Sequence, residues 1–443
     1  MSDLAYPYWR RNLAVLWFSQ FFTLGSISLV LPFVPYFLRE LAPSYSEEQL
    51  RVCSAASALV TQVAFAVAAP VWGWVADRYG RKKMLLRAVF GVSVVMGLMG
   101  MSTSVAMFIA LRFIQGLFTG TMSASMTLVS CSTPPEKRGF AVGILSSSFF
   151  SGDMAGLTLG GILAENFGYR NSFFITAVIS LVMGLIVLVG TVEKFSAGGA
   201  RDEVPRLAGE SRIHHLFHVW QVLIVPMLPI LLLYVFCSLA RYLDQSQLAL
   251  YIEKLNGGAG FRGKELCTSI IMGAGSLGAI ISGFVLSRFV DRRARFIATA
   301  IGLIAAAAML MMAVLPYCLP MEPRFSLAWL GHPRLTTTLC ALALVPLRFI
   351  MIFAAGGMEP ICHTWLTKAT SPEHQGVMFG YAQTFRAIGS SLAHIAAGII
   401  APTLGLTAIY VAGPVAFIIF VIAVQAAYPH IVRRMAACGT ATA

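Results

Sequence analysis

The chain is built from long apolar segments separated by short polar stretches. Most of these segments reach about 20 residues, the length at which a helix rising about 1.5 Å per residue crosses a bilayer. The pattern predicts twelve such helices, near residues 13–38, 52–76, 84–103, 105–131, 139–164, 171–191, 220–250, 266–287, 295–316, 336–366, 377–401 and 406–427. We therefore expect an all-α polytopic membrane protein with 12 transmembrane helices.

A polar stretch rich in charge and histidine divides the helices into two sets of six. We expect an N-terminal six-helix bundle over residues 1–191, a cytoplasmic linker over 192–218 and a C-terminal six-helix bundle over 219–443. The linker contains His214, His215 and His218. No cysteine or acid stands at ligand spacing from them, so we expect hydrated side chains rather than a metal site.

The composition also indicates a protein embedded in a bilayer, because 58% of the residues are hydrophobic and only 12% are charged. A net charge of +13 could suit nucleic acid, but the Lys and Arg residues lie in short loops between apolar segments, so no nucleic-acid partner is expected. Most of these basic residues fall on the side of the two termini. The positive-inside rule then predicts cytoplasmic termini and a multi-pass protein of the bacterial inner membrane, which we expect to be monomeric.

The two halves also repeat one another. The run Leu111–Ile114 recurs as Leu347–Ile350, 236 residues later, and several glycines recur in nearly the same register. The matched segments cross the membrane in the same direction. This predicts parallel repeats related by a pseudo-twofold axis along the membrane normal.

Three motifs carry a family resemblance. The run Gly73–Lys83, with Asp77, Arg78, Gly80 and Arg81, resembles the signature loop of the major facilitator superfamily, and a degraded copy covers residues 283–293. Arg112-x-x-Gln115-Gly116 is similar to the arginine motif of its proton-driven members. The glycines of the predicted fifth helix resemble the family's antiporter motif, with Leu157 in place of the usual proline; they are Gly152, Gly156, Gly160 and Gly161.

The resemblance extends over the whole chain and is closest to the multidrug-efflux branch of drug:proton antiporters. It implies the major facilitator fold and a proton-coupled secondary active transporter that exports small amphiphilic molecules, drugs or metabolites, by alternating access. The expected partners are a small-molecule substrate, protons and the lipid bilayer. The expected energy source is the proton gradient, without a cofactor or metal.

Ionisable residues at membrane depth are candidates for function, because each costs about 2.5–3.5 kcal/mol to insert. They are Arg112, Asp153, Arg241, Asp244, Arg348, Glu359 and Arg386. We expect Asp153 and Arg112 to form a switchable pair in which Asp153 titrates, with a static ion pair as the alternative. Glu359 is a further candidate for proton coupling.

Polar residues of the predicted cavity are candidates for contact with substrate: Arg386, Gln115, Arg348 and Gln383. Arg386 has no obvious local acid, and unpaired it would attract an anionic group. Glu359 and Arg348 are eleven residues apart, about 16 Å along a helix, which argues against direct pairing. Arg241 and Asp244 are three residues apart, so we expect them to pair with each other.

The loop and glycine motifs suggest mechanical roles. Asp77 is expected to reach a helix end of the other half and lock one access state, with Arg78 and Arg81 pairing acids nearby. The fifth-helix glycines are expected to let another helix approach closely, across the interface between the halves.

Two alternatives stay open at this point. The first is an exporter or symporter of a specific anionic or zwitterionic metabolite, such as a siderophore or sugar derivative, because four intramembrane arginines face three acids. The second is a membrane-embedded enzyme or receptor. The sequence contains no nucleophile elbow, HExxH, P-loop or CxxC cluster, and this argues against the second alternative.

Overall fold

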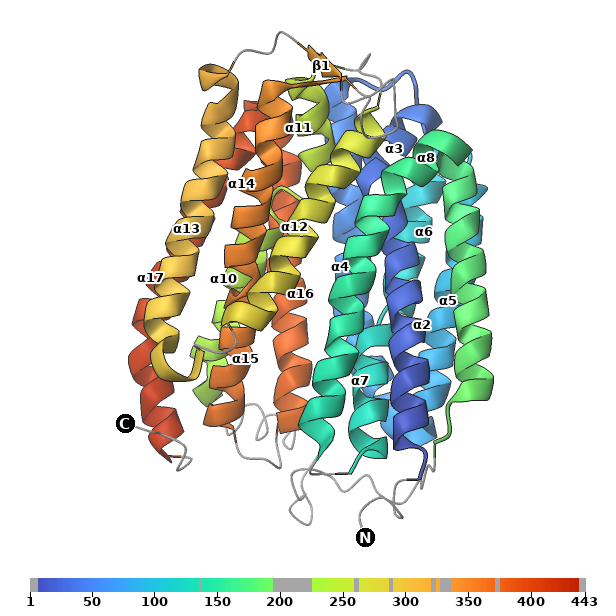
Figure 1. Ribbon diagram of the computed structural model, residues 1–443, viewed down its shortest axis with the longest axis vertical. Coiled ribbons are helices and arrows are strands. Elements are labelled where there is room, and N and C mark those ends of the chain that lie inside the picture. Colours follow the sequence, from blue (N-terminus) through green and yellow to red (C-terminus); the bar gives the residue numbers. More distant parts are fainter. Residues whose placement is uncertain are drawn as a thin grey trace, which may run out of the picture.

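The computed structural model describes residues 7–134, 137–193, 225–258, 263–286, 290–319, 324–326, 336–370 and 375–437. Ten helical stretches in this part of the chain are long and apolar enough to cross a membrane. One of them, Ser147–Gly190, makes two crossings because the chain reverses at Gly168 (Figure 1). The short apolar helix Val105–Phe118 forms a further crossing with the helix that follows it. The predicted all-α fold with twelve crossings is confirmed.

The first bundle contains the elements up to α8. They are α2 (Trp9–Val30), η1 (Leu31–Phe33), α3 (Val34–Leu41), α4 (Glu47–Tyr79), α5 (Arg81–Gly100), α6 (Val105–Phe118), α7 (Thr121–Ser132) and α8 (Arg138–Gly190). The prediction of one helix over 105–131 needs correction, because Thr119 and Gly120 separate α6 from α7.

The second bundle begins with the short turn η4. Its elements are η4 (Val225–Met227), α10 (Leu228–Tyr242), α11 (Leu248–Leu255), α12 (Lys264–Leu286), α13 (Val290–Cys318), β1 (Arg324–Ser326), β2 (Thr336–Thr338), α14 (Leu339–Gly356), α15 (Met358–Ala369), α16 (Gln375–Leu404) and α17 (Leu406–Ala437). The small antiparallel pair β1–β2 was not predicted. It delays the start of α14 to Leu339, where the side chain of Thr338 caps the helix.

A single glycine turns α8 back on itself. Gly168 has φ +77° inside an otherwise helical run. This backbone conformation is energetically unfavourable for a residue with a side chain but not for glycine. An added Cβ would find no atom within 4 Å, so the backbone angle, and not crowding, requires glycine there. The fifth and sixth crossings are therefore joined by one residue.

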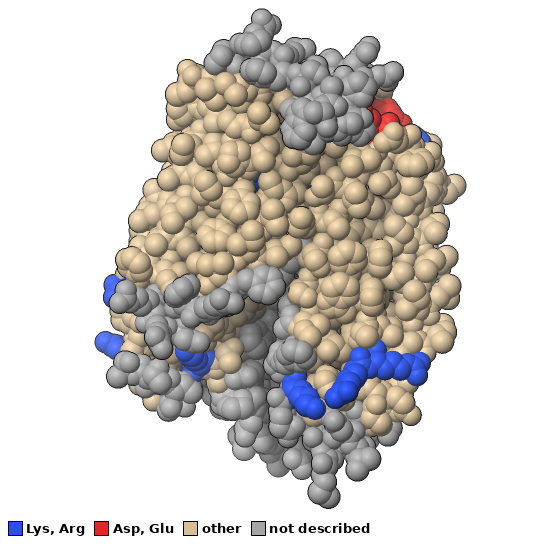
Figure 2. All heavy atoms as spheres, viewed as in Figure 1, with Lys and Arg blue, Asp and Glu red and all other residues tan. Residues whose placement is uncertain are grey.

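Each bundle has its own hydrophobic core, and the two lie side by side (Figure 1). Helix α2 begins and α17 ends at the lower end of the figure, which we call the termini end. The opposite end, where β1 and β2 pair, we call the sheet end. On the face drawn in Figure 2, Lys and Arg gather toward the termini end and acidic atoms show near the sheet end.

The glycines of α8 form a seam against α2 of the same bundle. A Cβ on Gly152, Gly156 or Gly160 would lie 2.4, 2.0 or 2.2 Å from the backbone oxygen of Phe21, Gly25 or Leu29. Small residues allow this approach because the two backbones can come into contact. The expectation of packing across the two halves was therefore wrong for these three glycines. Only Gly161 faces the second bundle, at the backbone of Glu265 in α12.

The signature segment is mostly helical rather than a loop. Helix α4 continues to Tyr79, α5 begins at Arg81, and only Gly80 between them leaves the helical conformation, with φ +102°. The backbone N–H groups of Arg81 and Lys82 donate to the carboxylate of Glu193, both at 2.9 Å. An acid at a helix N-terminus satisfies unpaired donors and the helix dipole, so Glu193 ties α5 to the end of α8.

The predicted linker, with His214, His215 and His218, lies almost entirely outside the described residues. The boundaries predicted for the two bundles at 191 and 219 stay predictions.

We expect Gly156→Ala to lower thermal stability, because its Cβ would meet the Gly25 carbonyl and force α2 and α8 apart. Overpacking of this kind costs about 1–3 kcal/mol. Gly380→Ala is the control, since a Cβ there meets nothing within 4 Å. Unfolding temperatures of both purified variants test this, and equal values for Gly156→Ala and wild type would contradict it.

Candidate functional site

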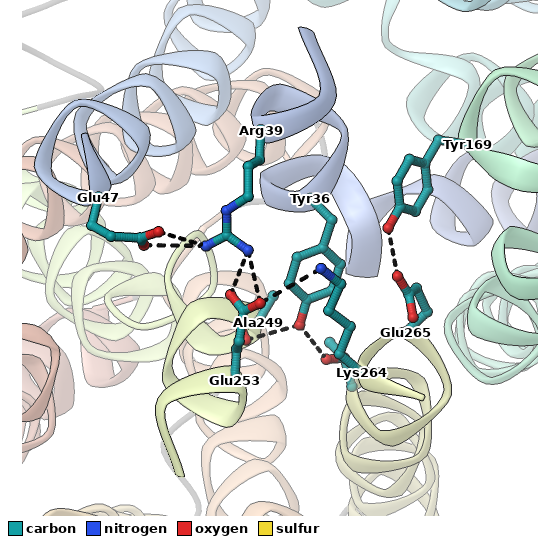
Figure 3. A network of polar contacts seen from close by, with 9 residues as sticks. Tyr36, Arg39, Glu47, Tyr169, Ala249, Glu253, Lys264 and Glu265 are labelled. Carbon is teal, nitrogen blue, oxygen red and sulfur yellow. Dashed lines mark hydrogen bonds and ion pairs between the residues drawn. The ribbon is translucent and has the colours of Figure 1, made fainter. Parts of the chain in front are cut away.

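The two bundles are joined at the sheet end by a network of polar contacts (Figure 3). The Tyr36 hydroxyl donates to the carbonyl of Ala249 at 3.0 Å and lies 3.0 Å from the hydroxyl of Thr268. Tyr169 donates to Glu265 at 2.5 Å. Both tyrosines belong to the first bundle and their partners to the second, so these bonds hold the bundles together.

Glu253 of α11 is the centre of this network. Both carboxylate oxygens accept from one nitrogen of Arg39, at 2.7 and 2.8 Å, and Lys264 lies 3.5 Å away. The other terminal nitrogen of Arg39 reaches Glu47 at 3.0 Å. Only 4% of the Glu253 side chain is exposed, so its charge depends on these cations for stabilisation.

The contacts that join the bundles in the described part of the chain, which we call the closure, lie toward one end of the molecule. Further hydrogen bonds join Ser54 to the carbonyl of Ser246 and Gln247 to the carbonyl of Arg51. Among hydrogen bonds between two described residues, all those joining the bundles lie between mid-depth and the sheet end. This conformation is therefore closed at the sheet end.

A second group of charges lies near the middle of the second bundle, around Glu359. Its carboxylate is 3.6 Å from Arg241, 3.8 Å from Arg386 and 3.7 Å from the ring of His363. These four residues, which we call the Glu359 cluster, come from α10, α15 and α16. Arg386 was expected to lack an acid, and the structure corrects this.

Helix interruptions help to place the charges of the Glu359 cluster. Glu359 lies in the first turn of α15, just after the break at Gly357, and Arg241 lies in the last turn of α10. An acid at a helix start and a base at a helix end both complement the helix dipole. Discontinuous helices form substrate and ion sites in other transporters for this reason.

Neighbouring polar groups orient the cluster. Arg386 donates from Nε to the side chain of Gln383 at 2.9 Å, and the Tyr234 hydroxyl lies 2.8 Å from Nδ1 of His363. The charged members keep some accessible surface, 21% for Glu359 and 26% for Arg386. The cluster is thus partly accessible to water as well as internally paired.

Asp153 lies where the two bundles meet at mid-depth. Its carboxylate accepts from Ser28 of α2 at 2.5 Å and from Ser276 of α12 at 3.3 Å. The structure does not bring it together with Arg112. Arg241 is instead the arginine close enough for an electrostatic interaction with Asp153, and it interacts with Glu359 as well.

Arg112 is held inside the first bundle. It donates to Gln115 at 2.9 Å, its guanidinium lies 5.5 Å from the Phe108 ring centre, and it is 5% exposed. His394 of α16 is close enough for an electrostatic interaction with it. Arg112 and Gln115 therefore contact each other, and neither contacts the Glu359 cluster by hydrogen bond or ion pair within the described residues.

Arg348 and Asp244 form a buried ion pair with a distance of 2.5 Å. Their side chains are 7% and 0% exposed. This corrects the expected pairing of Asp244 with Arg241, since each of the two takes a partner from the tenth crossing instead. It also places Arg348 among groups that fix helices together, away from accessible surface.

For the predicted lock, only part of the motif can be placed. The side chains of Gly73, Asp77 and Arg78 lie outside the described residues. Gly80 forms the helix break and Arg81 begins α5, as described above. The contact predicted for Asp77 stays a prediction.

Cysteines and metal-binding groups add no further site within the described residues. Six cysteines whose side chains are described are free thiols: Cys53, Cys237, Cys267, Cys318, Cys340 and Cys362. No group of three His, Cys, Asp or Glu side chains gathers at ligand distance in the same part of the chain.

Comparison with known proteins decides the family. Residues 16–331 match the sequence profile of the Major Facilitator Superfamily. The chain belongs to the major facilitator superfamily. It is a multi-pass membrane transporter of this superfamily and not an enzyme.

Similar proteins include two called Multidrug resistance protein MdtG. The one from Escherichia fergusonii is 30% identical over 411 residues, covering 91% of this chain and 90% of that protein. The one from Citrobacter koseri is 30% identical over 407 residues and covers 91% of each. The predicted resemblance to the multidrug-efflux branch is confirmed.

Solved structures share the fold at low identity. The nucleoside transporter NupG superposes with a TM-score of 0.69 at 11% identity, over 94% of this chain and 99% of that one. A bacterial homolog of the human lysosomal transporter Spinster, in an inward-facing and occupied conformation, gives 0.62 at 16% identity over 97% of both chains. These likenesses support the two-bundle architecture of the superfamily.

Sequence reasoning missed three features of the site. Ser28 and Ser276 hold Asp153, His363 stands beside Glu359, and Arg241 joins the cluster. The spacing of Glu359 and His363, four residues apart, was a usable signal because such residues share a helix face. The serines gave no signal, since their partner comes from another helix.

We expect Arg348→Met to lower the unfolding temperature strongly, because it leaves Asp244 buried without a cation. Breaking a buried pair in this way costs about 3–5 kcal/mol. The double variant Arg348→Met with Asp244→Asn should recover most of the loss, and thermal unfolding of both proteins measures it. A double variant as unstable as the single one would contradict this assignment.

We expect Glu253→Gln to loosen the sheet end. Hydrogen bonds to a charged group contribute about 1.5–3 kcal/mol, so the open population should rise about tenfold or more. The reporter is a cysteine at Ser269, which lies against Gly161 at the bundle interface, in a background without other cysteines. Its maleimide labelling rate should increase, and Glu48→Gln, an exposed acid at the same end, should leave it unchanged. An unaltered rate in Glu253→Gln would refute the closure.

Proposed function

We propose that this chain is a proton-coupled antiporter that exports small amphiphilic molecules by alternating access. The observation that carries the proposal is the accessible Glu359 cluster together with the closure, which within the described residues joins the bundles at the sheet end. The name of the MdtG relatives supports drugs or drug-like metabolites as cargo. The proton gradient would be the only energy source, with no cofactor.

The orientation follows from charge. Lys and Arg gather at the termini end, which we assign to the cytoplasm of a bacterium by the positive-inside rule. The sheet end then faces outward from the inner membrane, and the conformation described is the one that loads cargo from inside. We also propose that the protein works as a monomer with the bundle boundaries predicted above.

Glu359 is suited to exchange a proton for cargo. As a carboxylate it is paired with both Arg241 and Arg386, and protonation would release both cations at once. Arg241 also senses Asp153, so a charge change at Glu359 reaches the interface of the two bundles. A proton drives transport only by favouring one conformation over the other, and a carboxylate bound from both bundles through Ser28 and Ser276 provides that dependence.

A second candidate is export or symport of a specific anionic or zwitterionic metabolite. Two arginines and one acid in the Glu359 cluster favour it, because they present more positive than negative charge to a cargo molecule. Cargo with a carboxylate or phosphate would replace Glu359 as the partner of Arg386.

Transport into inside-out proteoliposomes under an imposed pH gradient tests both candidates. We expect uptake of a lipophilic fluorescent cation such as ethidium by wild type, and at least a tenfold loss of gradient-driven uptake in Glu359→Gln and in Asp153→Asn. Glu48→Gln, an exposed acid outside the site, is the control and should retain the wild-type rate.

The outcomes separate the alternatives. Uptake of anionic but not cationic dyes would favour the second candidate. Full gradient-driven transport by both variants would overturn the proposed coupling residues. Transport that ignores the pH gradient would overturn proton coupling itself.

A further inference from the structure

A groove of about 560 Å³ lies between the start of α2 and the first half of α8 at the termini end. Its volume falls within the range of ligand sites, about 300–1,000 Å³. Its lining includes Trp9, Arg10, Leu13, Trp17, Phe18 and Ile144. None of these residues belongs to the Glu359 cluster or to the closure.

The groove opens toward the bilayer. Ala14, Phe18 and Phe22 are one helical turn apart on α2, and all three are exposed, Phe18 to 56%. A stripe of exposed aromatic side chains on a crossing helix faces lipid, because lipid is the apolar solvent there. Trp17 forms the inner wall, held by a hydrogen bond from its indole N–H to Ser147 of α8 at 3.1 Å. The wall is therefore apolar and ordered.

One cation, Arg10, lines the groove, and a second, Lys137, lies beside it against Trp9. The guanidinium of Arg10 lies 5.4 Å, and the ammonium of Lys137 5.3 Å, from the ring centre of Trp9. Cation–π contacts of this kind fix the positions of charged side chains that otherwise move freely. The groove thus combines an apolar floor with a positively charged edge at the depth where α2 begins.

We infer that this groove is a binding site for one anionic phospholipid of the adjacent leaflet. The phosphate lies against Arg10 and Lys137, and one acyl chain occupies the space between α2 and α8. Charge complementarity selects this occupant, because a zwitterionic lipid gains no net attraction from two cations. Basic pockets between transmembrane helices at the cytoplasmic side bind acidic headgroups on the same principle.

The bound lipid spans the two helices that the glycine seam joins. Its headgroup meets α2 through Arg10 and the segment before α8 through Lys137, while its chain contacts Trp17 and Ile144. Occupancy therefore adds contacts between α2 and α8 at the end that the seam does not reach. The inference needs only membrane insertion and is independent of cargo and proton coupling.

Quenching of tryptophan fluorescence by brominated acyl chains tests the site directly, since bromine quenches only at close range. The Trp17 signal is the difference between wild type and Trp17→Phe in nanodiscs of zwitterionic lipid with a small fraction of brominated lipid. We expect brominated phosphatidylglycerol to quench this signal at least threefold more than brominated phosphatidylethanolamine. Unbrominated phosphatidylglycerol should compete and restore it.

Variants connect the preference to the rim and the groove. Arg10→Gln with Lys137→Gln should abolish the preference for the anionic lipid, while Lys83→Gln, an exposed cation at the same end, should keep it. Ala14→Phe should fill the groove and lower quenching by either lipid. Equal quenching by the two lipids in wild type, or a preference that survives the double substitution, would overturn the inference. Competition by a transported dye but not by phosphatidylglycerol would assign the groove to cargo and also overturn it.

Discussion

Charge in a medium that cannot solvate it is the constraint on which this structure depends. Each ionisable group at membrane depth needs an opposite charge, hydrogen-bond partners or access to water. The chain uses all three solutions. Arg348 and Asp244 neutralise each other out of reach of solvent, Asp153 is held by hydroxyl donors, and the Glu359 cluster remains accessible. The buried pair fixes helices, whereas the cluster keeps surface that water can reach.

The same constraint separates contacts within a bundle from contacts between bundles. The α2–α8 seam is made of glycine backbones in close approach, which leave little room for adjustment. The bundles are joined at the sheet end by hydrogen bonds and ion pairs, and also by packing of α8 on α12 and of α4 on α16. Their relative position therefore depends both on polar side chains and on the helix faces in contact.

Much of the fold was predictable because apolar length, repeat register and loop charge are properties of the sequence itself. The twelve crossings followed from them, and the family followed from the resemblance of three motifs. Helix interruptions at Gly120 and Gly357 were missed because each is a local change within a continuous apolar run. The face on which the α8 glycines pack was also missed, since spacing identifies a small-residue stripe but not the helix that covers it.

The sequence identified several residues of the site but not which of them pair with each other. Glu359 and Arg386 were identified by the cost of burying them and Gln383 as a polar residue of the predicted cavity, and the structure brings the three together. The partners Arg241, His363 and Ser276 depend on how helices distant in sequence meet, which local spacing does not encode. The i,i+3 rule suggested Arg241 with Asp244, but two stronger cross-helix partners were available. Tertiary packing overrode the local geometry.

The two terminal nitrogens of Arg39 bind acids of different bundles, and this affects the free energy needed to separate the bundles. One nitrogen holds Glu253 in the opposite bundle while the other holds Glu47 in its own, and Glu253 in turn retains Lys264 beside it on the second bundle. When the bundles separate, Arg39 stays paired with Glu47 in the first bundle and Glu253 stays paired with Lys264 in the second. No charge is then left without a partner of opposite sign. Within this group of charges, separation then breaks only the bond between Arg39 and Glu253, in addition to the other hydrogen bonds that join the bundles.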